Sequence, residues 1–394
     1  MPDIKRDNNV KVIAFYLPQF HSIPENDRAW GEGFTEWNNV KKAKPLFKGH
    51  NQPRMPLNGN YYNLLNDDVK KWQASIAKQY KIYGFCYYHY WFKDGKKLLE
   101  KPAEQMLANK EIDIPFCFSW ANENWSKRWD GGDKEIIAEQ DYGNKTDWIR
   151  HIEYLIPFFK DSRYITYDSR PVFLIYKPEL IPHLQDMIRV WDEELQRNGL
   201  NRLCLIIQNC GWYFSPLYNP KLFDFQIEFE PFFSMIYNEK NMNKLNKEKQ
   251  LMKVIRRLHI EKPCELLYKM LQNKKDDLHR GNSLTHNNYD EVWNTILNIK
   301  TSDFMIKGAF CDWDNTPRNV RGRVFDNVSV KSFSKYFDQE VEQVSSSNNP
   351  VIFINAWNEW GEGTYLEPDT KNNYGYLDAI KKAVLDHANK EEII

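Results

Sequence analysis

Two glutamates, Glu359 and Glu362, lie three residues apart in the stretch 355–364, which reads Asn-Ala-Trp-Asn-Glu-Trp-Gly-Glu-Gly-Thr. They directly follow Pro350–Ile354, an apolar run with the length and β-branched content typical of a buried strand. Neighbouring carboxylates push their pKa values apart, so that one can hold a proton while the other lacks it. That division suits acid/base chemistry on a sugar. The alternative is an ordinary charged loop after a core strand.

Polar and aromatic residues also follow other predicted strands, and we expect many of them to bind substrate. The candidates are Trp37, His89, Tyr90, Trp120, Asn122, Glu123, Trp125, Glu228, Asp312, Trp313, Asp314, Arg318, Asn358 and Trp360. For three of them the sequence leaves another interpretation open. His89 could be a hydrogen-bonded core residue, and Glu228 could lie on the outer face of its strand. The role of Trp313, which lies between two aspartates, is ambiguous. Asp312-Trp313-Asp314 also has the Asp-x-Asp form that holds a divalent cation in nucleotide-sugar transferases, but three residues match by chance very often.

The elements that would position these residues alternate along the chain. Strands are expected at 10–17, 84–91, 115–120, 171–176, 203–208, 223–229, 308–313 and 351–356, and helices at 66–83, 101–109, 148–159, 183–198, 289–299, 332–345 and 376–389. About eight strands alternating with helices in 394 residues predict an α/β fold, a (β/α)8 TIM-like barrel, whose catalytic groups gather at the carboxyl ends of the strands. The rival is a doubly wound open sheet, but its Gly-rich phosphate turn cannot form from Leu17-Pro18-Gln19-Phe20-His21.

We expect a single catalytic domain over residues 1–394. A long insertion at about 232–300, rich in Asn and Lys, would separate strands six and seven, and its role as a lid or a partner surface stays open. Residues 22–60 are predicted as one long loop, which in a compact domain is usually functional.

The composition excludes several classes of function. The 54 basic and 54 acidic residues balance, which argues against nucleic acid and anionic membranes as partners. The sequence has no run of 18 apolar residues, so we expect no membrane span. The polar N-terminus argues against a secretory signal. Six scattered cysteines without a CxxC pair indicate a reduced, cytoplasmic chain without zinc, and we expect no other metal and no cofactor. Aromatic residues make up 15%, and many of the 14 Trp lie beside polar residues, which favours a sugar-binding surface.

Six stretches resemble the WbsX-like family, whose members are often labelled glycosyltransferases of O-antigen and capsule clusters. They are 15–21 (FYLPQFH), 35–37 (TEW), 83–92 (YGFCYYHYWF), 120–125 (WANENW), 312–318 (DWDNTPR) and 355–363 (NAWNEWGEG). This family is in turn distantly similar to the glycoside hydrolase family 99 endo-mannosidases, which are (β/α)8 barrels.

Those hydrolases carry a Glu-Trp-His-Glu-Gly-Thr stretch, which 359–364 matches with Gly361 in place of the histidine. The resemblance implies that Glu362 is the general acid/base on the glycosidic oxygen. It also implies that Glu359 deprotonates a neighbouring sugar hydroxyl, which attacks the anomeric carbon and gives retention. This differs from the usual scheme, in which the second carboxylate is itself the nucleophile. Because of Gly361, specificity for mannose does not follow.

Three functions therefore remain open, all with an oligo- or polysaccharide as partner. The first is a retaining endo-glycoside hydrolase, or transglycosidase, acting on a bacterial surface polysaccharide. The second is a glycosyltransferase of O-antigen or capsule (lipopolysaccharide) biosynthesis, which would bind sugar nucleotides and depend on manganese. The third is a non-catalytic glycan-binding barrel, whose binding would survive replacement of both glutamates by glutamine. The oligomeric state is not indicated.

Overall fold

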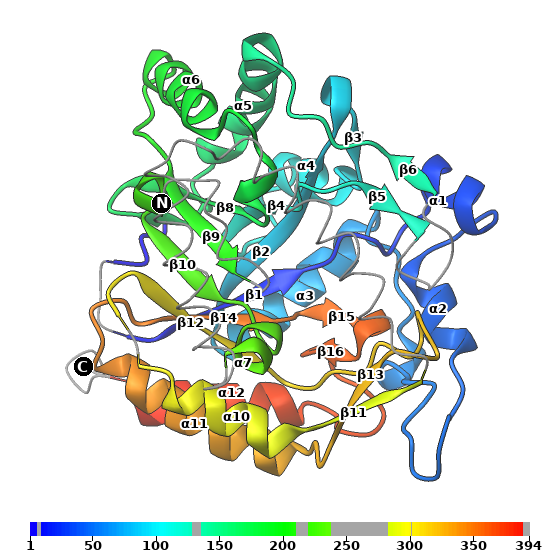
Figure 1. Cartoon of the computed structure of the whole chain (residues 1–394). Helices are drawn as coiled ribbons and strands as arrows, with labels where there is room; N and C mark the ends of the chain where they lie inside the picture. Colours follow the sequence, from blue (N-terminus) through cyan, green and yellow to red (C-terminus); the bar gives the residue numbers. More distant parts are fainter. Residues whose placement is uncertain (6–8, 128–134, 210–219, 238–282, 301, 389–394) are drawn as a thin grey trace, which may run out of the picture.

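The protein is a closed barrel of parallel strands, seen in a computed structural model that describes residues 1–5, 9–127, 135–209, 220–237, 283–300 and 302–388. Around the barrel the order is β1-β2-β4-β8-β9-β10-β12-β14, and β14 pairs with β1 to close it (Figure 1). The barrel strands are β1 (Lys11–Tyr16), β2 (Ile82–Trp91), β4 (Phe116–Trp120), β8 (Arg170–Ile175), β9 (Cys204–Asn209), β10 (Phe225–Glu228), β12 (Met305–Phe310) and β14 (Val351–Asn355). The predicted (β/α)8 barrel is confirmed.

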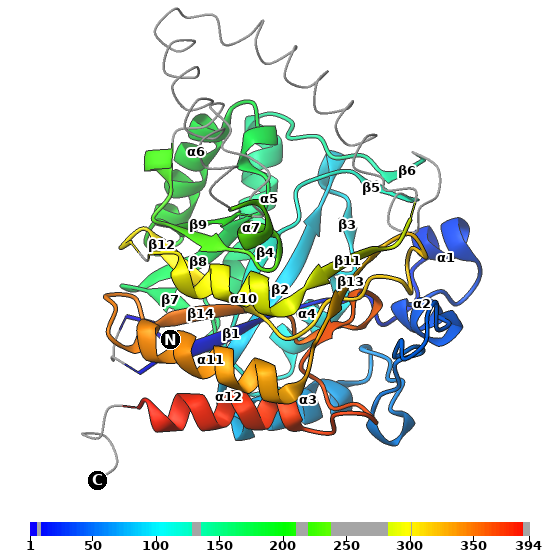
Figure 2. The same ribbon diagram turned by 60° about the horizontal axis from the view of Figure 1, so that its bottom comes forward.

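Helices surround the barrel and cover its outer face. They are α3 (Asp67–Gln79), α4 (Lys101–Ala108), α5 (Lys145–Phe159), α6 (Leu184–Arg197), α10 (Tyr289–Asn298), α11 (Val330–Ser345) and α12 (Gly375–Asp386). Figure 2 shows α10, α11 and α12 side by side along one side of the barrel. Each parallel strand is therefore covered on both faces, which explains why β4 and β14 are fully buried and, apart from Ser119 and Asn355, apolar.

The sequence of α11 illustrates how these helices form. Ser329 caps the helix, accepting a hydrogen bond from the backbone N–H of Ser332 at 3.0 Å. Phe333, Phe337 and Val341 recur every four residues and are completely buried. A helix places such residues on one face, so this stripe packs on the barrel.

Aromatic rings fill the barrel interior. The Phe15 ring of β1 contacts Tyr88 of β2, Phe353 of β14 and Phe229, which follows β10, at centroid distances of 5.7, 5.7 and 5.1 Å. β1 and β10 are not neighbours in the barrel, so the contact with Phe229 crosses the interior.

Several expected boundaries were wrong. Residues 22–60 contain two short helices, α1 (Pro24–Trp30) and α2 (Glu36–Lys42), because Pro24 begins the first and a capping box formed with Thr35 begins the second. The helix expected at 66–83 ends at Gln79, since Lys81 adopts a φ of 64° and turns the chain into β2. The strand expected at 308–313 starts earlier, at Met305.

The proposed insertion at 232–300 lies largely outside the described residues, since 238–282 are not described, and the same holds for Cys210 and Cys264. Its described parts are α7 (Phe232–Ile236), the short strand β11 (Thr285–Asn288) and α10. β11 pairs in parallel with β13 (Arg323–Asp326), which follows β12. No helix in the described part of the chain has the length and apolar character needed to cross a membrane.

Candidate active site

A cavity of about 400 Å³ opens at the carboxyl ends of the barrel strands. Every barrel strand except β1 contributes to it, either from its last residues or from the loop that follows. The lining residues are Tyr88, Tyr90, Ala121, Glu123, Asn124, Trp125, Tyr176, Lys177, Gln208, Phe229, Phe232, Trp313, Asn315, Arg318, Glu359 and Glu362. A concave site that mixes aromatic and charged groups at this end of a barrel is typical of an enzyme active site.

Arg318 organises the carboxylates of this cavity. Its Nη2 lies 3.0 Å from Glu359 Oε2, and its Nη1 lies 2.6 Å from Glu362 Oε1. Its Nε donates to Glu36 Oε1 at 2.8 Å. One buried guanidinium thus binds three carboxylates, and it fixes Glu359 and Glu362 relative to each other through the rigid geometry of its fork.

The electrostatics of the cluster favour bound protons. Burial raises the pKa of Glu359 to about 8; Arg318 opposes this rise, whereas the negative charges of Glu362 and Glu36 add to it. Burial likewise raises the pKa of Glu362. The same three carboxylates keep the pKa of Arg318 well above its usual range, so the guanidinium stays charged. One positive charge cannot balance three negative ones, and the cluster therefore keeps a proton near neutral pH.

Gly361 makes this arrangement possible. A Cβ atom at position 361 would lie 1.7 Å from Glu36 Oε1 and 2.8 Å from Arg318 Nε. The glycine therefore leaves the space that the carboxylate of Glu36 occupies. Glu36 reaches it from the first turn of α2, in the long segment between β1 and α3.

Two pairs of aromatic rings line the cavity. Tyr90 of β2 packs edge-on against Trp125, with a centroid distance of 4.8 Å. Trp313 and Phe232 form a second edge-on pair at 4.7 Å. Aromatic faces of this kind suit the apolar C–H faces of a sugar ring, while the polar groups between them suit its hydroxyls.

Two asparagines hold cavity loops in place without lining the cavity. The side chain of Asn122 accepts from the N–H of Lys177 at 2.7 Å and donates to its carbonyl at 2.7 Å. Asn358 bonds to both backbone groups of Leu17 in the same way, at 2.7 and 3.0 Å. Each amide acts like a short piece of strand, and it ties one strand-end loop to the next.

Several predicted substrate-binding residues lie in the interior, away from this cavity. Trp37 donates through Nε1 to the carbonyl of Tyr62 at 2.8 Å and packs against Trp360. His89 is buried, and its Nε2 lies 2.9 Å from Nε2 of His151 on α5, which matches the core alternative.

Glu228 and Trp120 also lie outside the cavity. Glu228 forms a buried ion pair with Lys307 at 3.1 Å, and Lys307 donates to two carbonyls near the end of α10, so Glu228 faces the helical layer. Trp120 is buried beside a different cavity, described below.

The carboxylates of Asp312 and Asp314 are occupied by protein groups. Arg54 Nη1 lies 2.8 Å from Asp312 Oδ2, and Gln52 Nε2 donates to Asp314 Oδ2 at 2.7 Å. His50 Nε2 lies 2.9 Å from the same oxygen of Asp314. These contacts attach residues 50–54 to the loop after β12, and they do not fit a cation site formed by the Asp-x-Asp stretch. Within the described ranges, no group of three His, Cys, Asp or Glu side chains is arranged to hold a metal ion.

Trp360 lies in the chain between the two glutamates and is held in place by buried contacts. It is completely buried, stacks on Tyr365 at a centroid distance of 3.7 Å, and donates through Nε1 to Glu367 at 2.7 Å. Glu367 also accepts from Tyr62 and Gln73, at 2.8 and 2.7 Å. Such a network fixes the short 3-10 helix Trp360–Glu362 and thereby the direction of Glu362.

Of the predicted residues, seven line the cavity: Tyr90, Glu123, Trp125, Trp313, Arg318, Glu359 and Glu362. Their contact with substrate stays a prediction. Sequence reasoning missed Glu36, the third carboxylate on Arg318, and the strand-end residues Tyr176, Lys177 and Gln208. The last three could have been found by applying the strand-end rule to β8 and β9 as well.

The fold agrees with that of known glycosidases. The structure of the GH99 endo-alpha-mannosidase from Bacteroides thetaiotaomicron superposes with a TM-score of 0.54 at 14% identity, covering 97% of this chain and 98% of that one. A structure described as a glycoside hydrolase-like protein gives a TM-score of 0.55 at 13% identity, covering 98% and 96%. At these identities the likeness establishes the fold alone.

Two curated proteins share more sequence identity with this chain than these structures do. These proteins of Xanthomonas campestris pv. campestris, from strains ATCC 33913 and B100, are each named "Uncharacterized protein WxcX" and are 33% identical over 382 residues. The match covers 95% of this chain but 49% of either relative, so the chain spans about half the length of the curated relatives it matches. Residues 12–380 match the model of the family described as glycosyltransferase WbsX, and the chain belongs to this family of carbohydrate-active enzymes.

Proposed function

We propose that this chain is a retaining endo-glycoside hydrolase that cleaves an internal bond of a bacterial surface polysaccharide. The observation that carries the proposal is the pair of glutamates bound to one guanidinium inside an aromatic cavity. Glu362 is the general acid/base on the glycosidic oxygen. Glu359 accepts the proton of a neighbouring sugar hydroxyl, which attacks the anomeric carbon.

The exposure of the two side chains supports these roles. The Glu362 side chain is 26% exposed, whereas that of Glu359 is 8% exposed. The more exposed carboxyl suits the proton donor, which must reach an oxygen between two sugar units. Burial raises the pKa of Glu362, which is the direction that a general acid requires.

The cations of the cavity favour hydrolysis over transfer from a sugar nucleotide. A pyrophosphate needs cationic or metal partners to offset its charge. Among the described residues, the two cationic side chains that line the cavity already pair with carboxylates: Arg318 with its three glutamates, and Lys177 with Glu123 at 2.5 Å. An uncharged stretch of glycan fits this environment better than a nucleotide diphosphate.

The second candidate is a glycosyltransferase of O-antigen or capsule biosynthesis. The description of the family that the sequence matches favours it. The same carboxylates would then activate an acceptor hydroxyl. This candidate requires lengthened products that depend on an added sugar nucleotide.

The test is incubation of the purified protein with fragments of bacterial O-antigen and capsular polysaccharides, with and without sugar nucleotides and manganese. Mass spectrometry reads the product lengths. The variant Glu362→Gln removes the acid, and Glu342→Gln, an exposed position on α11, is the matched control. We expect shortened products without nucleotide, a loss of about 100-fold or more for Glu362→Gln, and no loss for the control.

Each alternative has its own outcome. Lengthened products that need a sugar nucleotide would replace the hydrolase by the transferase. Binding without any product, unchanged in Glu359→Gln and Glu362→Gln, would show a non-catalytic glycan-binding barrel. NMR of the first product released by a hydrolase distinguishes retention from inversion at the anomeric carbon.

A further inference from the structure

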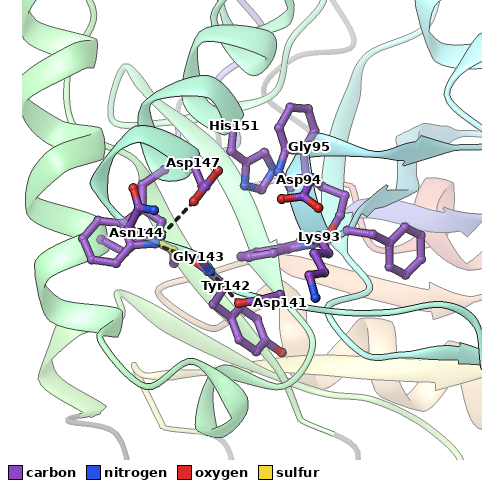
Figure 3. A pocket seen from close by; sticks show the side chains of 14 residues that line it. Lys93, Asp94, Gly95, Asp141, Tyr142, Gly143, Asn144, Asp147 and His151 are labelled. Carbon is purple, nitrogen blue, oxygen red and sulfur yellow. Dashed lines mark hydrogen bonds between the residues drawn. The ribbon is translucent and has the colours of Figure 1, made fainter.

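A second cavity of about 200 Å³ lies beside the active site and shares no lining residue with it. It is bounded by the turn after β2, by the end of β4, and by the segment that leads into α5. Figure 3 shows Lys93 and Asp94 on one side of this side cavity, with Asn144 and Asp147 on the other.

The walls of the side cavity combine aromatic rings with carboxylates. Trp91, Trp120, Tyr142 and Trp148 line it. Trp91 stacks on His151, with a centroid distance of 4.6 Å and an interplanar angle of 9°, which holds the indole in a fixed orientation. Trp91 and Trp120 are buried, whereas Tyr142 and Trp148 are partly exposed, so the last two are the rings that a ligand can reach. Fixed rings of this kind bind an apolar face at little cost in conformational entropy.

The polar groups of the side cavity differ in their availability. The Asp147 carboxylate accepts from the N–H of Asn144 at 3.0 Å and so belongs to the cap of α5. Asp94 is exposed at the rim, and among the described residues no group donates a hydrogen bond to its carboxylate. Two free carboxylate oxygens above aromatic walls suit a pair of neighbouring hydroxyls, which donate to them.

One residue joins the two cavities. Asn122 bonds through its side chain to the backbone of Lys177, which lines the active site, at 2.7 Å. Its carbonyl accepts from the hydroxyl of Tyr142, which lines the side cavity, at 2.7 Å. Asn122 thus ties a residue that lines the active site to a residue that lines the side cavity, and the two cavities share this support.

We propose that the side cavity is a second glycan-binding site, which holds a sugar unit of the same polysaccharide whose other units occupy the active site. The inference rests on the proposed glycan substrate. The aromatic rings carry the apolar face of the sugar, and Asp94 accepts hydrogen bonds from its hydroxyls. This site raises the affinity for a long chain and adds nothing for a fragment too short to reach it.

The test compares long and short ligands. Binding is measured on an immobilised array of purified bacterial O-antigen and capsular polysaccharides, and turnover is measured on the polymer and on its shortest cleavable fragment. The variants are Asp94→Asn, which retains a residue that tolerates the φ of 57° at this position, and Trp148→Leu. Glu153→Gln, exposed on the same helix as Trp148, is the matched control.

We expect Asp94→Asn to weaken polysaccharide binding by about tenfold, because a hydrogen-bonded carboxylate is lost. The kcat/KM for the polymer should fall by a similar factor, while turnover of the shortest fragment and the melting temperature stay unchanged. Trp148→Leu should act in the same direction. If it does not fold, Asp94→Asn alone decides.

The possible failures are distinguishable. If the parent chain cleaves the polymer and Asp94→Asn binds and cleaves it equally well, the side-cavity site is wrong and the proposed function stands. If the variants lose binding although no product forms with any ligand, the site stands and the hydrolase is wrong. A parent chain that binds no glycan on the array overturns both.

Discussion

The distinctive residue of this site is Arg318, because a single guanidinium faces three carboxylates. Glu359 and Glu362 follow one strand, whereas Glu36 comes from a distant helix. Burial raises the pKa of both Glu359 and Glu362, and the negative charge of Glu36 adds to this rise. Glu36 therefore tunes the proton affinity of the proposed catalytic groups.

This tuning predicts a pH profile. The active form of the coupled pair holds one proton, so kcat/KM should fall in acid, where both groups are protonated, and again near pH 8, where the pair loses its last proton. Glu36→Gln removes a negative charge that favours the bound proton. The alkaline limb should therefore move to lower pH. A pH–rate series on the cleaved polysaccharide fragment measures it, and a limb that stays fixed or moves to higher pH would refute the tuning role.

Gly361→Ala tests how tightly the cluster is packed. The new Cβ would overlap Glu36 Oε1 and displace it from Arg318. We expect the free energy of unfolding to fall by about 1–3 kcal/mol and activity to fall at least tenfold. Thermal and urea unfolding measure the first effect. In the background of Glu36→Ala the space is empty, so Gly361→Ala should there cost little stability; an equal cost in both backgrounds would contradict the steric explanation.

The sequence predicted some residues of the candidate site and missed others. Glu359 and Glu362 were identified because they form a compact pattern after an apolar strand. Glu36 received no role, since nothing local to residue 36 reveals that its carboxylate meets position 361. Asp312, Asp314 and Asn358 were expected to bind substrate, and yet they bond to Arg54, to Gln52 and to the backbone of Leu17. A polar residue at a strand end can serve the ligand or the neighbouring loop, and its type alone does not distinguish the two.

Among the elements, β10, β12 and α11 meet at an unusual buried cluster. Glu228, Glu230 and Glu340 lie there with one cation, Lys307. Burial raises the pKa of Glu228 to about 7 and that of Glu230 to about 8, and it raises the pKa of Glu340 well above the ordinary value. The Lys307 ammonium balances one carboxylate, so the packing of α11 on the barrel depends on protons held by the others.

This cluster predicts a loss of stability at high pH. The folded state binds protons that the unfolded state releases at its lower pKa, so the free energy of unfolding falls as pH rises through about 8. Glu340→Gln removes one ionisable group from α11. It should raise the melting temperature relative to the parent by more at pH 9 than at pH 6. Glu342→Gln, exposed on the same helix, should show no such difference; equal behaviour of the two variants would exclude the cluster as the cause.

The sequence located most elements but not all their ends. The apolar runs of the eight barrel strands are clear because parallel strands are buried on both faces. The helix expected to reach Tyr83 stops earlier because Lys81 adopts a left-handed conformation, and a lysine gives no warning of it. The helices α1 and α2 were missed inside 22–60, since both are short and only their first residues carry a signal.

At the scale of the whole molecule, the barrel is closed by β14, which pairs with β12 on one side and with β1 on the other. The first and last strands of the barrel are therefore neighbours. Alternation of strands and helices predicted the number of strands and the barrel, because such an order has few closed solutions. It could not predict that residues 22–60 lie at the carboxyl end of the barrel and bind the loop after β12.

Because β14 closes the barrel, we predict that the C-terminal part of the chain is required for stable folding. Removing residues 346–394 deletes β14 and α12, and it leaves β1 and β12 with exposed edges. We expect this shortened chain to lose its cooperative unfolding transition in urea, followed by tryptophan fluorescence. Removing 389–394 alone leaves every described element in place and should not shift the midpoint. A cooperative transition in the shorter chain would show that the remaining strands form a stable open sheet.

The contact between Gly361 and Glu36 has an evolutionary consequence. Since the glycine leaves the space that the acid fills, the two positions are expected to vary together across the WbsX family, although they are far apart in the chain. A relative with a bulky residue at the first position cannot keep the acid at the second in the same place. The two positions would then separate lineages in which one arginine binds three carboxylates from lineages in which it binds two.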